Sequence, residues 1–173
     1  MVSTFFKWFG LLILAVALLW VIGVAVLGHA GLLALLFGEP DRPRIDFATL
    51  QKTDRPNQYL VCPRDLCAAT PDRDAPVYAV PASDLRDALL AAVAGEPRVR
   101  LLVADAEAGY YEFEQTSRFL GFPDTITVQV FGRDNDTSTL AIYSRAHYGY
   151  RDFDINKTRI DAWLAKLKLP EAS

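Results

Sequence analysis

The feature that most constrains this chain is a long apolar run close to its start. Residues 9–37 contain no Asp, Glu, Lys or Arg, and nearly every position from 9 to 27 is apolar. A helix over residues 9–27 is about 28 Å long, close to the hydrocarbon thickness of a bilayer. The run is too short for two spans of about 20 residues each. The sequence therefore predicts one membrane-spanning helix within residues 9–37, after a short tail of residues 1–8.

The same run is also compatible with a buried core helix, which its length disfavours, and with a cleaved signal peptide. Gly28-His29-Ala30 offers the small residues that a signal peptidase needs, and Lys7 supplies a basic n-region. The run is long for a signal peptide, however, and cleavage would leave the apolar residues 31–37 at the new terminus. We expect an uncleaved anchor that crosses once, with the signal peptide as the alternative.

Basic residues and cysteines give opposite indications of orientation. Lys7 precedes the run, whereas four Lys and Arg residues follow it within residues 42–55, so the positive-inside rule argues against a periplasmic domain. Cys62 and Cys67 are the two cysteines of the chain, and such a close pair suggests a disulfide in an oxidising compartment. Two reduced thiols in a cytosolic domain are the alternative. We expect a protein of the bacterial inner membrane with its C-terminal domain in the periplasm.

Charge balance and metal-ligand types argue against several functions. The chain has 18 Lys and Arg against 21 Asp and Glu, and all except Lys7 follow the apolar run. We expect no nucleic-acid partner, because affinity for phosphate backbones depends on clustered basic residues. His29 lies in the apolar run and His147 stands alone, so no zinc site is predicted. Residues 133–137 resemble a solvated turn more than a calcium loop, and we expect neither metal nor cofactor.

The remaining sequence divides into a linker and one domain. Prolines among charged residues mark 38–56 as a linker, and a globular domain follows over residues 57–169, with a tail of residues 170–173. The domain pattern predicts a strand at 77–80, a helix over 83–94, four strands at 98–105, 110–118, 125–131 and 137–147, and a final helix from Asp154. The strand links are too short for crossover helices. The order β-α-β-β-β-β-α predicts an α+β fold, a curved antiparallel sheet packed by helices on one face.

Aromatic residues are concentrated between positions 110 and 153, and some of them must form the core. Phe131 and Tyr143 point to the opposite side of the sheet from the predicted core residues Val130 and Ile142. An apolar ligand cavity, a membrane-facing patch or a protein interface would each use such residues. The candidates for interaction are Phe119, Phe122, Phe131, Tyr143, Tyr148 and Tyr150, and the alternative is a large aromatic core with scattered surface rings.

A Ser, His and Asp set occurs at Ser144, His147 and Asp152, but it does not predict catalysis. Ser144 and His147 are three positions apart on a presumed strand and therefore point to opposite faces. The sequence also lacks the Gly-x-Ser-x-Gly elbow of many hydrolases. We expect a non-catalytic domain in which an Asp caps the final helix and Arg159 reaches a carboxylate.

Two segments resemble the domain of unknown function 1499 family (DUF1499). Residues 144–160 (SRAHYGYRDFDINKTRI) resemble its C-terminal signature, and residues 116–124 (TSRFLGFPD) resemble its mid-domain motif. The matched positions are Arg118, Phe122, Asp124, Ser144, Gly149, Asp152, Asn156 and Arg159. The family pattern has Ser, Arg and Gly where this chain has Ala146, His147 and Asp154. The resemblance implies a grouping that is often membrane-associated and has no established reaction.

The motif residues predict one polar cluster at an end of the sheet. Its expected members are Arg118, Asp124, Ser144, Asp152, Asn156 and Arg159, and we expect it to lock the last helix to the sheet. Any binding surface would lie beside it. The sequence favours a single-pass membrane protein whose outer domain docks on another membrane protein, as an accessory subunit of a complex. The alternative is a carrier or sensor of a lipid-like apolar ligand.

Overall fold

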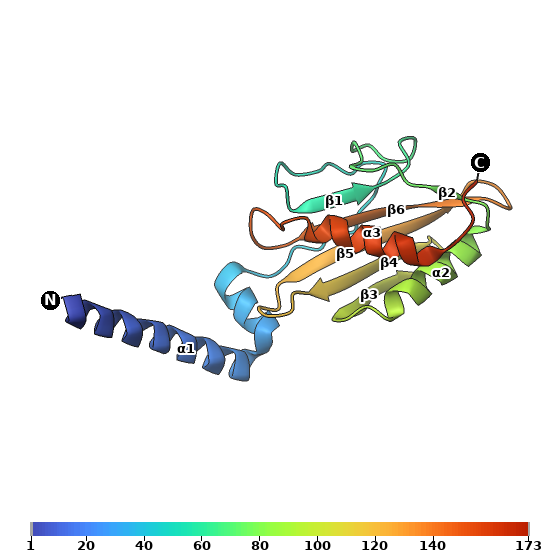
Figure 1. The fold of residues 1–173 in the computed structure, drawn as a ribbon. Helices are drawn as coiled ribbons and strands as arrows, with labels where there is room; N and C mark the ends of the chain where they lie inside the picture. Colours follow the sequence, from blue (N-terminus) through green and yellow to red (C-terminus); the bar gives the residue numbers. More distant parts are fainter. Residues whose placement is uncertain (1, 173) are drawn as a thin grey trace.

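A computed structural model describes residues 2–172 of the chain (Figure 1). It begins with α1, Val2–Phe37, a long apolar helix that Gly28 interrupts with φ 71° and ψ 170°. Within the described residues this is one helix long and apolar enough to cross a membrane. After Gly28 the chain turns back on itself, and a Cβ on Gly23 would lie only 2.9 Å from Leu32 Cδ1. The apolar run is therefore a long helix followed by a short one, with Leu32 and Leu33 buried.

The domain after α1 is a six-stranded antiparallel sheet with two helices. Its strands are β1 Gln58–Val61, β2 Val77–Tyr78, β3 Val99–Asp105, β4 Tyr110–Thr116, β5 Pro123–Gly132 and β6 Ser138–Ala146. The sheet order is β1-β6-β5-β4-β3, and β2 also pairs with β6. Helices α2, Ala82–Ala94, and α3, Ile155–Leu167, lie on one face of the sheet (Figure 1). The predicted α+β class and antiparallel sheet are confirmed.

Strand β1 is an addition to the predicted order. Its four residues stand between Pro56 and Pro63, and so short a segment shows no clear alternation. In the fold it pairs with β6, beginning with Gln58 opposite Arg145. This pairing brings Asn57, immediately before β1, to the end of the sheet where β6 leads into α3.

The space between the two helices and the sheet is a filled apolar core. Leu85 and Leu89 of α2 are fully buried, and Trp163 of α3 is 1% exposed. Trp163 packs edge-on against Phe113 of β4, with ring centroids 5.7 Å apart. The alternate residues of β5 that the pattern assigns to one face, Ile126, Val128 and Val130, belong to this core.

Residues 38–56, which the sequence presents as a linker, cover the opposite face of the sheet. Ile45, Phe47 and Leu50 are buried there in a second core that includes Tyr143. Arg42 forms an ion pair with Glu114, a buried residue of β4. This segment therefore contributes to the packing of the domain and holds it against the end of α1.

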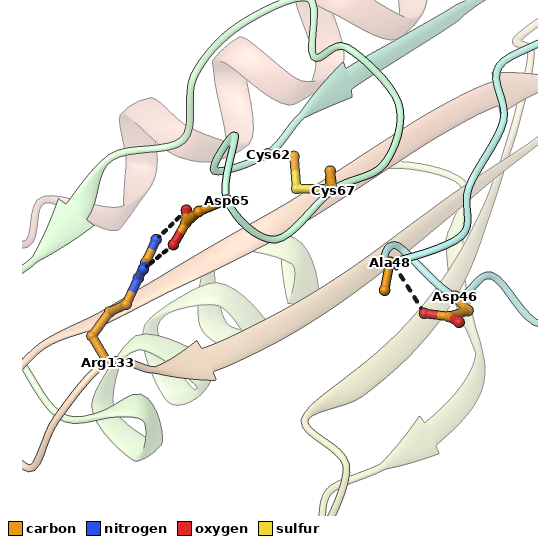
Figure 2. Close-up of a disulfide and its surroundings, with 6 residues drawn as sticks. All are labelled: Asp46, Ala48, Cys62, Asp65, Cys67 and Arg133. Carbon is orange, nitrogen blue, oxygen red and sulfur yellow. Dashed lines mark hydrogen bonds and ion pairs between the residues drawn. A yellow bond between two sulfur atoms is a disulfide. The ribbon is translucent and has the colours of Figure 1, made fainter.

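A disulfide closes the loop that follows β1 (Figure 2). The Cα atoms of Cys62 and Cys67 are 6.3 Å apart, and Cys62 is fully buried in the second core. Figure 2 shows Asp65 of this loop facing Arg133 of the β5–β6 turn, whose guanidinium donates to both carboxylate oxygens over 2.5 and 2.8 Å. The predicted cysteine pairing is confirmed, and the loop it closes packs on the second face of the sheet.

Candidate functional site

The β4–β5 turn, the β6–α3 connection and the C-terminal end of α1 meet at one end of the sheet. A Cβ on Gly121 would lie 2.8 Å from His29 Cβ, and its φ of +69° also favours glycine. Tyr148 Oη donates a hydrogen bond to Gly38 O over 2.6 Å. Figure 1 shows α1 at this end of the domain and the C-terminus at the opposite end. The two sequence motifs therefore come together beside the apolar helix.

Arg159 of α3 is the centre of a buried polar cluster at this end. Its Nη1 donates to Ser144 Oγ over 2.8 Å and to Asn156 Oδ1 over 2.6 Å. Its Nη2 donates to Asp124 Oδ2 over 2.6 Å, and its Nε donates to Gln115. The Arg159 side chain is only 6% exposed, so these acceptors replace the water that burial removes. The guanidinium thereby joins α3 to the adjacent strands β4, β5 and β6.

Asn156 extends the cluster to the segment before β1. Its Nδ2 donates to Asp152 Oδ2 over 2.6 Å and to Asn57 O over 3.0 Å. Asp152 Oδ2 also accepts the backbone N–H of Asn156 over 2.9 Å, which satisfies one of the free donors in the first turn of α3. Five of the six residues predicted to cluster are thus brought together: Asp124, Ser144, Asp152, Asn156 and Arg159.

Arg118 is the sixth, and it lies outside this network. Its guanidinium lies 5.5 Å from the ring centroid of Phe119, and its side chain is exposed. Arg118 lies in the β4–β5 turn, whereas Gln115 and Asp124 lie on the strands that the turn connects. Arg118 is therefore available to the surface beside the cluster.

Ser144 and His147 are held by different partners. Ser144 Oγ donates to Asn156, whereas His147 Nε2 lies 2.6 Å from Thr125 Oγ1. Burial, with a contribution from Arg145, lowers the pKa of His147 to about 4, so its ring is neutral at pH 7. The arrangement gives Ser144 no general base, and within residues 4–172 no three His, Cys, Asp or Glu side chains form a group that could hold a metal.

A buried ion pair stands at the centre of the cluster. Asp124 and Arg159 have side chains that are 13% and 6% exposed. Burial raises the pKa of Asp124, and the positive charge of Arg159 opposes that rise. Such a pair tolerates little movement, because separating its members leaves a charge in a poorly solvated place. The geometry supports the predicted structural role of the cluster, which is to hold α3 in register with the sheet.

A cleft of about 820 Å³ opens beside this cluster, at the end of the sheet and not between the sheet and α3. Asp124, Asp152 and Arg159 of the polar cluster are part of its lining. Its apolar lining includes Phe37, the last residue of α1, which lies 5.4 Å from the Tyr148 ring between centroids. The volume falls within the usual range of ligand sites, roughly 300–1,000 Å³. The cleft is therefore large enough for a small molecule or part of a lipid.

Exposed aromatic side chains lie on the two loops that contribute to the cleft: Phe153 lines it, and Phe119 and Tyr150 are sequence neighbours of lining residues. Phe119 is 81% exposed, Tyr150 63% and Phe153 88%. Phe153 and Asp154 both have left-handed backbone, with φ of 54° and 62°, a region that costs a non-glycine residue free energy. At Asp154 a glycine would avoid this cost. At Phe153 the strained backbone holds an aromatic ring that is exposed to solvent and adds almost no packing to the fold.

The six aromatic candidates occupy three different environments. Phe119 and Tyr150 are exposed, whereas Phe122 and Tyr148 are half-buried in the lining of the cleft. Phe131 is half-buried against the second core. Tyr143 is 3% exposed, because residues 38–56 cover its face of the sheet, so it offers no surface contact. The sequence indicated which face Tyr143 occupies but not what covers that face.

Several residues of the site are not singled out by the sequence, among them Phe37, Asn57, Gln115 and Phe153 and the cleft arginines Arg55, Arg98 and Arg151. Phe153 lies within the C-terminal motif, and an unfavourable backbone angle has no sequence signal when the residue is not glycine. Gln115 and Asn57 carry no motif, and their roles depend on strand pairing. Phe37 was assigned to the anchor, and its contact with the domain follows from the turn at Gly28.

The comparisons with known proteins agree with the motif resemblance. No curated protein matches the chain. The model of a family described as a protein of unknown function (DUF1499) matches residues 49–167, more than half of the chain and nearly all of the domain. The match begins within the segment that packs on the second face and ends at the last residue of α3. The chain therefore belongs to the DUF1499 family.

Proposed function

We propose that this is a single-pass membrane protein whose non-catalytic domain holds a lipid-like apolar ligand in the cleft beside α1. The observation that carries the proposal is the position of the cleft. Its lining combines Phe37, at the end of the apolar helix, with the polar cluster of the domain. A ligand in this cleft would contact the protein at the level where the chain leaves the bilayer.

The geometry of α1 supports this position. The part before Gly28 supplies the length of a bilayer span, at 1.5 Å per residue over about 30 Å. The short helix after Gly28 then lies at the membrane surface, with its end against Tyr148. The contact between His29 and Gly121 keeps the β4–β5 turn close to the membrane. The cleft-bearing end of the sheet then faces the bilayer, and the disulfide favours the periplasmic side.

The exposed aromatic residues support a lipid environment. Phe153 is held in strained backbone and gains no burial within the domain. Strain of this kind persists at binding sites, where the side chain has a use that the isolated fold does not supply. Phe119 and Tyr150 stand on the neighbouring segments of the same end. Aromatic rings are common at the level of lipid headgroups, where they contact both apolar and polar groups.

The second candidate function is docking on another membrane protein, as an accessory subunit. One observation favours it: exposed apolar side chains run from the end of α1 onto the two loops of the domain. Lipid binding is the stronger proposal, because these residues lie beside a cleft of ligand size, whereas a docking surface would need only a flat apolar patch. The two functions predict that different molecules co-purify with the protein, a lipid in one case and a protein partner in the other.

The test is to extract the full-length protein from its own membranes in a mild detergent and to weigh it by native mass spectrometry. The proposal predicts a monomer that retains a recurrent lipid-sized mass. Phe153→Ser should reduce the retained fraction several-fold, whereas Leu101→Ser, which alters an exposed apolar residue of β3, should not. A stoichiometric protein partner without bound lipid would instead support docking.

A further inference from the structure

We infer that the cleft selects the anionic headgroup of a membrane phospholipid, and this inference rests on the proposed lipid function. The cleft is lined by five arginines: Arg55, Arg98, Arg118, Arg151 and Arg159. Two carboxylates, Asp124 and Asp152, line it as well. The lining therefore carries an excess of positive charge next to apolar side chains, which is the pattern that a negatively charged amphiphile would match.

The arginines of the cleft differ from the others in their ion pairing. Thirteen arginines occur in the chain, and eight of them form ion pairs with a carboxylate within the described residues. The five that form none in this part of the chain are Arg55, Arg98, Arg118, Arg145 and Arg151. Four of these five line the cleft. Guanidinium groups without a protein carboxylate are thus gathered at one place.

The two carboxylates of the cleft are already engaged. Asp124 accepts from Arg159, which leaves that pair nearly neutral. Asp152 accepts two hydrogen bonds from Asn156 through one oxygen. Neither carboxylate lies within ion-pair distance of the exposed arginines. Arg98 Nε donates to the backbone oxygen of Thr116. The side chains of Arg55, Arg118 and Arg151 donate no hydrogen bond within the described residues and keep their attraction for an outside anion.

This positive site stands in a domain with the opposite overall charge. Acidic residues outnumber basic ones in the chain, and every acidic residue lies after the apolar run. If charged residues were distributed evenly over the domain, the lining of a cleft would therefore carry a small net negative charge. Arginine binds phosphate oxygens through paired N–H donors and is the side chain best suited to a phosphate group. Basic groups at a membrane surface also gain attraction from anionic lipids.

The apolar part of the lining specifies a lipid over a free anion. Phe37, Phe122 and Tyr148 form one wall, with ring centroids 5.4 to 6.3 Å apart. This wall continues from α1, so acyl chains could stay in or near the bilayer while the phosphate reaches the arginines. Inorganic phosphate would use only the polar half of such a site. The expected occupant is therefore an anionic glycerophospholipid of the surrounding membrane.

The test compares two lipids that share the phosphate group but differ in the net charge of the headgroup, which is negative in one and zero in the other. Full-length protein in mild detergent is titrated with phosphatidylglycerol or phosphatidylcholine of identical acyl chains, and bound lipid is counted by native mass spectrometry. We expect phosphatidylglycerol to bind about tenfold more tightly. The triple variant R55Q/R118Q/R151Q should lose most of this preference, because phosphatidylglycerol binding falls more than phosphatidylcholine binding. The matched control R64Q/R73Q/R86Q removes three arginines outside the cleft and should keep the preference.

The outcomes separate this inference from the proposed function. Equal binding of the two lipids would overturn the headgroup selectivity and leave the lipid function standing. Failure of the folded protein to bind either lipid would overturn both. Competition by inorganic phosphate at concentrations that match lipid binding would identify a free-phosphate site and overturn the assignment to a phospholipid. Thermal unfolding of each variant tests whether a lost preference comes from a lost fold. We expect the fold to be retained, because the three substituted cleft arginines are exposed and form no ion pair within the described part of the chain.

Discussion

Arg159 Nη2 lies 2.6 Å from Asp124 Oδ2, and this contact fastens α3 to the start of β5. The same guanidinium also donates to Ser144, Asn156 and Gln115, so α3 cannot separate from the sheet without leaving several buried groups unpaired. Because Arg159 and Asp124 both line the cleft, one set of contacts sets the fold and the shape of the site.

Arg159→Ala should lower the free energy of unfolding by about 3–5 kcal/mol, since it leaves the buried Asp124 carboxylate without its partner. Arg73→Ala, which removes an exposed pair with Asp161, should cost less than about 1 kcal/mol. Denaturant titration of the full-length protein in detergent, followed by circular dichroism, measures both. An Arg159→Ala protein of normal stability that had lost its ligand would show that the cluster is a binding site and not a structural lock.

The segment that resembles a linker should prove essential to stability. Phe47 is 1% exposed in the second core, and Phe47→Ala should cost about 3–5 kcal/mol because it opens a cavity there. Phe119 is 81% exposed, and Phe119→Ala should change stability by no more than about 0.5 kcal/mol. Thermal unfolding of the two variants provides the comparison. Equal midpoints would mean that residues 38–56 do not pack on the sheet in solution.

The disulfide offers a prediction about both stability and compartment. A loop closed by cysteines five positions apart should add about 2 kcal/mol by restricting the unfolded chain, so C62A/C67A should unfold correspondingly earlier. In intact cells the two thiols should resist maleimide until a reductant is added. Labelling of both cysteines without reductant would contradict an oxidising compartment and would place the domain in the cytosol.

Local patterns predicted most of the fold, and tertiary contacts explain what they left out. The alternation of apolar residues in β5 and the helical periodicity of α3 predict core residues such as Val128 and Trp163. They do so because both elements turn one regular apolar face toward the same core. Residues 38–56 have no such period. Ile45 and Phe47 lie in a segment that contains several charged residues and prolines, and only the second face of the sheet gives these two side chains a place to be buried.

The candidate site was predictable in part for the same reason. The motif residues of the polar cluster are predictable together, because the family resemblance groups them and places Asp152, Asn156 and Arg159 at the start of the last helix. Gln115 and Asn57 join them through the pairing of strands distant in sequence, which no local pattern encodes. The cleft itself depends on Gly28 turning the end of α1 toward Tyr148, a feature of three-dimensional packing.

His147 should make the stability of the domain fall at mildly acidic pH. Its pKa is about 4 in the fold, mainly because of burial, against 6.5 in the unfolded chain. The unfolded state therefore binds the additional proton between these values, and stability is complete above pH 6.5 and declines as pH falls toward 4. We expect a loss of about 1–2 kcal/mol, after allowing for partial exposure. Subtracting the pH profile of His147→Gln isolates this contribution, and identical profiles would contradict it.

Phe153→Gly should separate stability from binding. Phe153 has φ of 54° and is 88% exposed, so glycine relieves backbone strain and sacrifices almost no burial. The gain is expected to be about 0.5 kcal/mol, because relief of roughly 1–2 kcal/mol of strain is offset by the greater freedom of glycine in the unfolded chain. The same change should reduce lipid retention, since it removes an aromatic ring from the edge of the cleft. Unfolding in denaturant and native mass spectrometry on one preparation measure the two effects. A variant that is more stable but retains lipid normally would mean that the Phe153 ring has no binding function. A variant that is more stable but has lost the lipid would show that the strained backbone at Phe153 serves to place the ring against the ligand.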